Sequence, residues 1–224
     1  MEIIPTIIPK SLDDLREKLS FVRGAAPVVQ IDITDGAFAG KKSWPLNDDA
    51  AFQRMISEAE GLPFWEDFIF EVDFMITHTE ERAEDFFRAG FSRAVFHFGA
   101  ADDMHKALSL ARQYDVDAGI ALLPSEDPEI LKEYEGEFQF VQVMGIGRIG
   151  FQGERYDERA LHTVSRVREI FPDIIISVDG GISERTATLF RDAGADRLVA
   201  GSAIFHTDDP REAFLRLSSI TATD

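Results

Sequence analysis

The sequence alternates along its length between short apolar runs typical of strands and longer amphipathic stretches typical of helices. Residues 2–8 (EIIPTII) form the first strand-like run, and a helical stretch capped by Ser11 follows it. Counting this first pair, the chain contains eight such pairs of a strand and a helix. Strands and helices in alternation predict a parallel sheet, and eight such units predict a closed (β/α)₈ barrel. No linker interrupts the pattern, so residues 1–224 are predicted to form one domain.

The remaining expected elements have the following bounds. The strand-like runs cover 28–33, 68–76, 92–98, 116–123, 138–146, 173–181 and 195–205, and the helical stretches cover 48–60, 81–89 with Thr79 as N-cap, 101–114, 127–136, 157–171, 183–194 and 208–217. The alternative is an open doubly wound sheet, which usually has fewer strands and a glycine fingerprint near the N-terminus. Here the glycine-rich turns lie in the last third, which favours the barrel.

Charge and cysteine content exclude several classes of function. The formal net charge is −18, which argues against non-specific binding of nucleic acid or of an anionic membrane surface. A small anionic substrate is still allowed, because a site can be positive locally. The chain has no cysteine, which excludes disulfides, thiolate nucleophiles and cysteine metal sites. The acidic N-terminus, interrupted by Pro5 and Pro9, lacks signal-peptide character, and no apolar run is long enough to span a bilayer. A cytoplasmic protein is predicted.

Acidic residues fall at inward-facing positions of the expected barrel. In the run VVQIDIT (28–34), alternation turns Val29, Ile31 and Ile33 towards the helices and Gln30 and Asp32 towards the interior.

The same alternation turns Asp73, Met75 and Asp179 inward, and Met144 is expected to do the same. We expect Asp32 and Asp179 to face each other at the catalytic end, where one could remove a proton from a carbon and the other return it on the opposite face. The alternatives are a loop cap for Asp179 and a lysine ion pair for Asp32.

A third acid suggests a cation. Asp32, Asp73 and Asp179 together either raise each other's pKa values or recruit a divalent ion. Ligation by oxygen alone would suit Mg²⁺ or Mn²⁺ better than Zn²⁺. The alternative is that some of these acids are protonated or hydrogen-bonded without a metal.

Two glycine turns at the end of the chain predict a phosphate site. Gly180 and Gly181 follow the seventh strand, and Gly201 and Ser202 follow the eighth. Backbone N–H groups at this place in a barrel commonly hold phosphate, although glycines also simply form tight turns. The glycine-rich loop 145–157 carries Arg148, which could bind a phosphate or carboxylate or else pair with a neighbouring acid.

The ordered motifs resemble the ribulose-phosphate 3-epimerase family from end to end. They are IIPTIIP, QIDITDGAF, EVDFMI, AVFHF, VQVMGI, VDGGI and AGADRLVAGSAIF. The resemblance implies a barrel that epimerises a phosphorylated ketose of the ribulose 5-phosphate type. It implies acid and base roles for Asp32 and Asp179, and a phosphate cradle at the two glycine turns. It also places Thr6, Met75 and Met144 beside the substrate.

The chain departs from the family pattern at the metal site. The family's metal site uses two histidines and two aspartates, so the resemblance implies a divalent ion, with Mg²⁺, Mn²⁺ and Zn²⁺ left open. Here the histidines are replaced by Gln30 and Asp73. The sixth loop lacks the family's Asn-Pro and adds Arg148.

Three functions are therefore carried forward. The first is a sugar-phosphate epimerase whose partner is a small phosphorylated sugar, with a homo-oligomer left open. The second is a phosphate-binding barrel with lyase or decarboxylase chemistry that uses Arg148. The third is a non-catalytic homologue.

Overall fold

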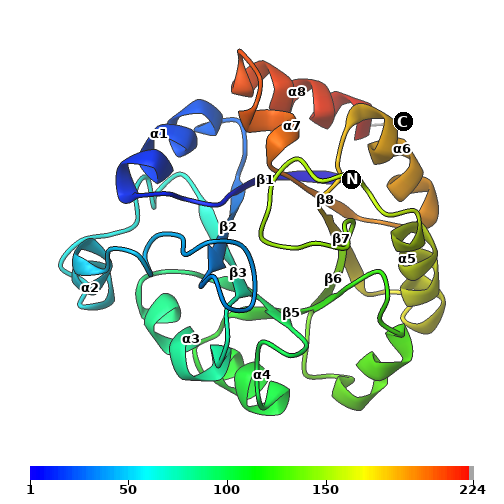
Figure 1. Ribbon diagram of the computed structural model, residues 1–224, viewed down its shortest axis with the longest axis horizontal. Coiled ribbons are helices and arrows are strands. Elements are labelled where there is room, and N and C mark those ends of the chain that lie inside the picture. Colours follow the sequence, from blue (N-terminus) through cyan, green and yellow to red (C-terminus); the bar gives the residue numbers. More distant parts are fainter. Residues whose placement is uncertain (222–224) are drawn as a thin grey trace.

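Eight parallel strands close into a barrel in the order of the sequence (Figure 1). A computed structural model describes residues 1–221, and residues 222–224 of the predicted domain lie outside it. The strands are β1 (Glu2–Ile7), β2 (Val28–Thr34), β3 (Ile69–Met75), β4 (Arg93–His97), β5 (Asp117–Leu122), β6 (Phe140–Met144), β7 (Ile175–Asp179) and β8 (Arg197–Ala200). The predicted (β/α)₈ barrel is confirmed.

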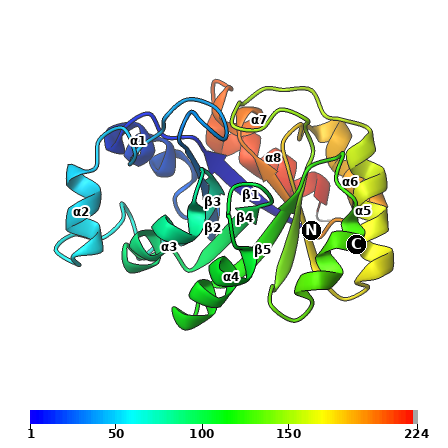
Figure 2. The same ribbon diagram turned by 60° about the horizontal axis from the view of Figure 1, so that its bottom comes forward.

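Helices surround the strands, as Figures 1 and 2 show from two directions. They are α1 (Leu12–Val22), α2 (Ala50–Ile56), α3 (Thr79–Arg88), α4 (Met104–Gln113), η1 (Pro128–Tyr134), α5 (Arg159–Ile170), α6 (Glu184–Ala193), α7 (Ser202–Phe205) and α8 (Pro210–Thr221). Ser11 caps α1 as expected, because its side chain accepts a hydrogen bond from the backbone N–H of Asp14.

Strand alternation separates an apolar outer layer from a polar interior. Val29, Ile31 and Ile33 of β2 belong to the large core cluster that also contains residues of the surrounding helices. Asp32 of β2 lies in register with Asp73 of β3, and Met144 of β6 lies in register with Asp179 of β7. The barrel therefore brings chemically active side chains from several strands to one end.

Three details of the predicted helices are wrong. Helix α2 ends at Ile56, whereas the prediction extended to residue 60, because residues 57–60 are all exposed and bury no apolar side chain against the barrel. Thr79 does not cap α3; it is the first helical residue, and its hydroxyl donates to the Ile76 carbonyl. The stretch after β5 is a 3₁₀ helix, in which Pro128 and Leu131 are buried at the three-residue spacing of that helix.

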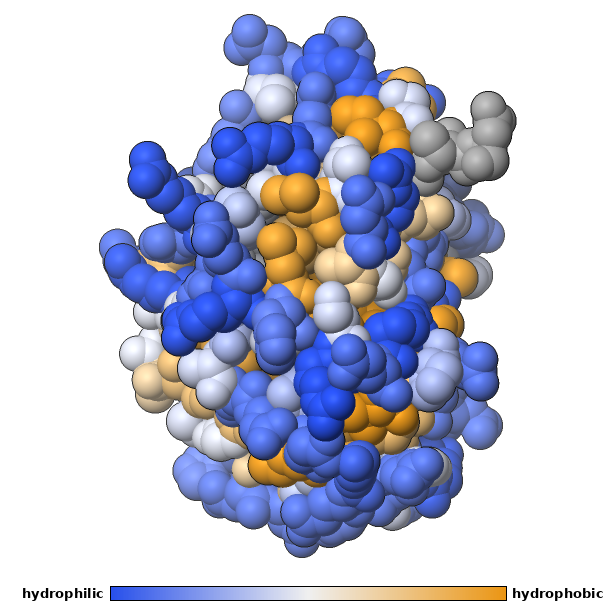
Figure 3. Space-filling view, turned by 90° about the vertical axis from the view of Figure 1, so that its right-hand side faces the viewer, coloured by the Kyte–Doolittle hydropathy of each residue, from blue (hydrophilic) through white to orange (hydrophobic). Residues whose placement is uncertain are grey.

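The side of the helix ring that carries α5 and α6 is mainly hydrophilic (Figure 3). Figure 3 views the molecule from the side on which α5 and α6 lie and shows apolar areas interrupted by hydrophilic side chains. Within residues 1–221, no helix combines the length and the apolar character that a membrane crossing requires.

Candidate active site

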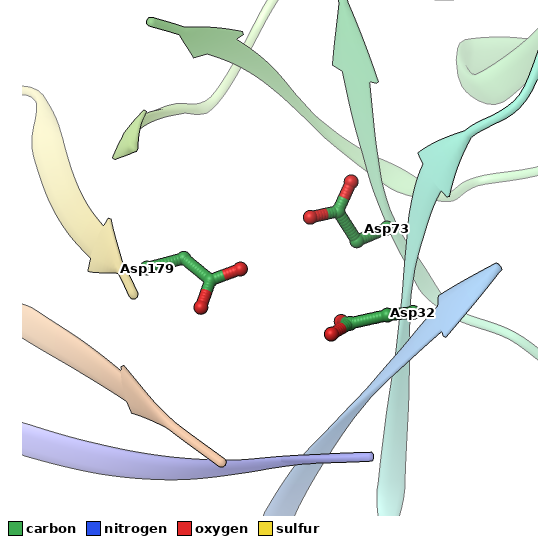
Figure 4. Close-up of side chains that lie close together, drawn as sticks. All are labelled: Asp32, Asp73 and Asp179. Carbon is green, nitrogen blue, oxygen red and sulfur yellow. The ribbon is translucent and has the colours of Figure 1, made fainter. Parts of the chain in front are cut away.

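Three buried carboxylates converge inside the barrel. Asp32, Asp73 and Asp179 come from β2, β3 and the end of β7, and Figure 4 shows them pointing towards a common centre. One carboxylate oxygen from each lies within 4.8 Å of the other two. None of the three side chains is more than 6% exposed.

Gln30 links the two acids that were predicted to face each other. Its Nε2 donates to Asp32 Oδ1 over 2.9 Å and to Asp179 Oδ2 over 3.2 Å. Thr6 Oγ1 donates to the same Asp32 oxygen over 2.6 Å. The partners of Asp32 are thus a hydroxyl and an amide, and the alternative of a lysine ion pair does not hold.

Asp73 is held by two other side chains. Its Oδ1 lies 2.7 Å from His97 Nε2, and its Oδ2 accepts a hydrogen bond from Gln142 Nε2 over 2.9 Å. Both partners are buried inward-facing residues of β4 and β6. This arrangement fixes the orientation of the Asp73 carboxylate next to Asp32.

Burial changes the acidity of both facing acids. Burial, followed by the nearby charge of Asp73, raises the pKa of Asp32 to about 7, although the hydrogen bonds from Thr6 and Gln30 act to lower it. Burial, followed by the nearby charge of Asp32, raises the pKa of Asp179 well above its ordinary value. Groups that titrate near neutrality are suited to proton transfer.

A small cavity of about 40 Å³ lies against these acids. Nine predicted site residues line it: Thr6, Asp32, Met75, Met144, Asp179, Gly180, Gly181, Gly201 and Ser202. Gly180 and Gly181 have φ of +95° and +67°, so both need the freedom of glycine. A Cβ on Gly181 would lie 2.5 Å from Cβ of Tyr156, so the turn is also packed too closely for a side chain.

The Ribulose-phosphate 3 epimerase family model matches residues 2–205. The chain belongs to this family. It is 31% identical over 186 residues to the ribulose-phosphate 3-epimerase of Chlamydia pneumoniae, covering 80% of this chain and 76% of that protein. It is 26% identical over 220 residues to that of Bacillus subtilis (strain 168), covering 95% and 96%. The expected resemblance, and an enzyme of the carbohydrate-phosphate epimerase class, are confirmed.

Solved structures share the fold. KGPDC from Streptococcus mutans in complex with D-R5P has a TM-score of 0.74 over 97% of this chain and 95% of that chain, at 14% identity. At this identity the likeness shows the barrel alone, and the lyase or decarboxylase alternative is matched only as a relative in fold.

Arg148 differs in position from the other predicted residues. Its guanidinium lies 3.7 Å from Glu154 Oε1 and stacks over the Phe151 ring at 3.9 Å. Among the described residues it is not part of the cavity lining, and its side chain is 66% exposed. A role in ligand binding stays a prediction of the sequence.

The sequence reasoning missed several residues beside the cavity. Gln142 lies two positions before Met144, so the same alternation could have placed it inside. Gln152 lines the cavity and donates from Nε2 to the Thr6 carbonyl over 3.4 Å. Arg155 and Arg185 line a neighbouring hollow that also contains Gly181 and Ser202. No motif indicated these two arginines, because their place depends on how the loops fold.

The residues present fit a hard divalent cation. The three aspartates offer oxygen ligands from one cluster, and Gln30 Oε1 is buried without a hydrogen-bond partner among the described residues. Oxygen ligands of this kind are preferred by Mg²⁺ and Mn²⁺, whereas Zn²⁺ favours nitrogen and sulfur. The chain therefore keeps a cluster that could hold a metal although it lacks two of the family's histidines.

Proposed function

We propose that this enzyme inverts carbon 3 of a ribulose 5-phosphate type ketose by moving a proton between Asp32 and Asp179. The observation that supports this most directly is the pair of buried carboxylates pointing towards each other beside a cavity (Figure 4). An epimerisation that uses no redox cofactor can proceed with one group that removes a proton from the carbon and a second group that returns a proton to the opposite face.

The contacts favour different protonation states for the two acids. Asp32 accepts hydrogen bonds from Thr6 and Gln30 on one oxygen, and both favour its ionised form. Asp179 accepts only the longer Gln30 bond among the described residues, and the charge of Asp32 favours its protonated form. We assign Asp32 as the base and Asp179 as the acid in the free enzyme.

The reaction then needs one proton removed and one returned. Asp32 takes the proton from carbon 3, and the C–H electron pair forms a carbon–carbon double bond as the carbonyl electrons move onto oxygen, which gives an enediolate. Asp179 gives its proton to the opposite face of carbon 3, and the carbonyl reforms. The Gln30 N–H group, directed between the two acids, can stabilise negative charge that develops there.

We assign the cation site to Asp32, Asp73 and Asp179, with Mn²⁺ or Mg²⁺ as the ion. When bound, such an ion would supply positive charge next to the developing oxyanion. His97 and Gln142 would hold Asp73 in place as a ligand, as outer partners of metal ligands commonly do.

The glycine turns would receive the phosphate. Gly180, Gly181, Gly201 and Ser202 line the same cavity as the two acids, so a phosphate at these turns would lie next to the acids. Met75 and Met144 add apolar surface between them. A cytoplasmic location and a homo-oligomer stay predictions of the sequence.

Single amide substitutions separate the two half-reactions. In deuterated buffer, we expect Asp179→Asn to keep exchange at carbon 3 of the epimer whose proton faces Asp32. Asp32→Asn keeps exchange only with the other epimer. In both variants the rate of net epimerisation should fall by about 10²–10⁴-fold. NMR of ribulose 5-phosphate and its carbon 3 epimer measures this rate.

Asp13→Asn is the matched control, because it makes the same chemical change on α1 at a side chain that is 91% exposed. Full epimerisation by either site variant would contradict the two-acid mechanism. Loss of exchange from both epimers in both variants would contradict the assignment of one acid to each face.

A further inference from the structure

A second cavity at the same end of the barrel is lined by lysines. It has a volume of about 570 Å³ and contains Lys10, Lys18, Lys41 and Lys42, which are four of the chain's six lysines. The other lining residues include Ser43, Asn47 and His206, and no aspartate or glutamate is among them. In a chain of net charge −18, this grouping is a local reversal of charge. We call it the lysine pocket.

The walls of the lysine pocket are tied together. The loop after β1 and the loop after β2 are joined by Trp44 N–H to Pro9 O over 2.9 Å and by Asn47 Nδ2 to Lys10 O over 2.9 Å. Thr34 Oγ1 donates to the Lys41 carbonyl. These bonds hold the backbone of the lysines in a defined arrangement before any ligand arrives.

Three of the four ammonium groups have no acidic partner in the part of the chain that the structure describes. Lys18 Nζ pairs with Asp14 Oδ2 over 3.0 Å. Within residues 1–221, no carboxylate lies within ion-pair distance of Lys10, Lys41 or Lys42. Their charges are therefore available to an anion that enters the pocket.

The lysine pocket is separated from the catalytic cavity by a shared wall. Ile8, Gly150, Phe151 and Gln152 line both cavities. The loop after β6 packs closely on the loop after β2, since a Cβ on Gly40 would lie 2.6 Å from the Gly150 carbonyl oxygen. Figures 1 and 2 show these blue and yellow-green loops at the same end of the barrel. A ligand in the lysine pocket would lie against the outer side of this wall.

We propose that the lysine pocket binds the phosphoryl group of a small molecule other than the substrate in the catalytic cavity. A phosphoryl group carries up to two charges and three acceptor oxygens, which match several ammonium donors better than a single carboxylate does. The volume lies in the range of small-molecule sites. The strong negative charge of the whole chain opposes nucleic acid as the occupant.

Calorimetric titration with inorganic pyrophosphate at low ionic strength tests the proposal. We expect the double variant Lys41→Ala/Lys42→Ala to weaken binding roughly tenfold or more, and Lys10→Ala to weaken it in the same direction. The matched control is Lys106→Ala/Lys132→Ala, which removes the two lysines outside the pocket and changes the net charge equally. This control should bind as the unchanged protein does. Thermal melts of all variants check that each one folds.

Competition with ribulose 5-phosphate shows at which of the two cavities pyrophosphate binds. With saturating ribulose 5-phosphate, pyrophosphate should still bind at the lysine pocket, because the two cavities are separate. Failure of the unchanged protein to bind pyrophosphate, equal weakening in both double variants, or one-for-one displacement by ribulose 5-phosphate would each overturn the proposal. The comparison of variants measures binding and does not require epimerase activity. A failure of this proposal can therefore be distinguished from a failure of the proposed function.

Discussion

At the scale of single residues, Gln30 determines how the two facing acids are held. Its amide donates to both carboxylates and adds no fixed charge between them. Its carbonyl oxygen is buried without a hydrogen-bond partner among the described residues. Such an oxygen is costly to leave unpaired and would gain a partner if the amide turned towards a cation. The proposed cation site would therefore gain a fourth oxygen ligand from this residue.

Replacing Gln30 with the histidine of the family pattern should change the preference of the site among cations. We expect Gln30→His to raise the affinity for Zn²⁺ relative to Mn²⁺ by roughly tenfold or more, because imidazole nitrogen suits Zn²⁺ and even outer partners change metal affinity by about 10–100-fold. Calorimetry with each ion measures the ratio directly. Gln53→His is the control, since it introduces the same imidazole at an exposed position of α2. An unchanged Zn²⁺ to Mn²⁺ ratio in Gln30→His would contradict a ligand role at position 30.

At the scale of elements, Asp35 joins the loops that follow β2 and β3. Its Oδ1 accepts hydrogen bonds from the backbone of Ala37 and Phe38, and its Oδ2 accepts two from Thr77. Partial burial raises the pKa of Asp35, but the hydrogen bonds outweigh burial and the pKa lies below its ordinary value. The ionised side chain therefore stabilises the connection between two loops at the catalytic end.

Removing this charge should cost stability in a pH-dependent way. Because the folded state lowers the pKa, the stabilisation is present above the unfolded pKa of about 4 and is lost as the pH falls through the folded value. We expect Asp35→Asn to lower the free energy of unfolding by about 1 kcal/mol at pH 7 and by less at pH 3. Urea denaturation measures it, with the exposed Asp48→Asn as control. An equal loss at both pH values would contradict the electrostatic origin.

Strands and helices differed in how far the sequence could predict them. Alternation placed Asp32, Asp73 and Asp179 inside correctly, because successive side chains of a strand point to opposite faces and the apolar set on each strand must face the helices. The end of α2 and the 3₁₀ form of η1 depend on which side chains find a surface to pack on. Helix propensity alone does not contain that information.

At the scale of the whole molecule, closure of the barrel decides which distant residues meet. Gln142 reaches Asp73 from three strands away, and four lysines from α1 and two loops line one cavity. Residue type and spacing predicted the acids and glycine turns, since each belongs to one strand end. Alternation could place Gln142 inside, but its contact with Asp73 depends on the complete ring, and the lysine pocket depends on how the loops fold.

Closure also buries a charged layer below the three aspartates. Glu71 is fully buried next to Arg93 in the strand register, and neither of its carboxylate oxygens has a hydrogen-bond partner among the described residues. Burial raises the pKa of Glu71 to about 7, against the attraction of Arg93 and Arg197. The ionised form of this side chain is therefore less stable in the folded barrel than in the unfolded chain.

This penalty should make the stability of the whole barrel fall as the pH rises. The folded pKa lies above the unfolded one, so the penalty is absent below about pH 4 and grows until the pH passes about 7. A shift of this size corresponds to about 3 kcal/mol at pH 8. We expect Glu71→Gln to stabilise the protein by up to that amount at pH 8 and by much less at pH 5, measured by urea denaturation.

The exposed Glu66→Gln serves as the control for this substitution, because it makes the same chemical change outside the barrel interior. Its effect on the free energy of unfolding should stay near zero at both pH values. If Glu71→Gln instead destabilised the protein equally at pH 5 and pH 8, the carboxylate would be favourably paired with Arg93 and Arg197. Glu71, Arg93 and Arg197 would then stabilise the barrel as an ion-pair network. In that case the closed ring of strands would hold the two arginines close enough to offset the cost of burying the Glu71 carboxylate.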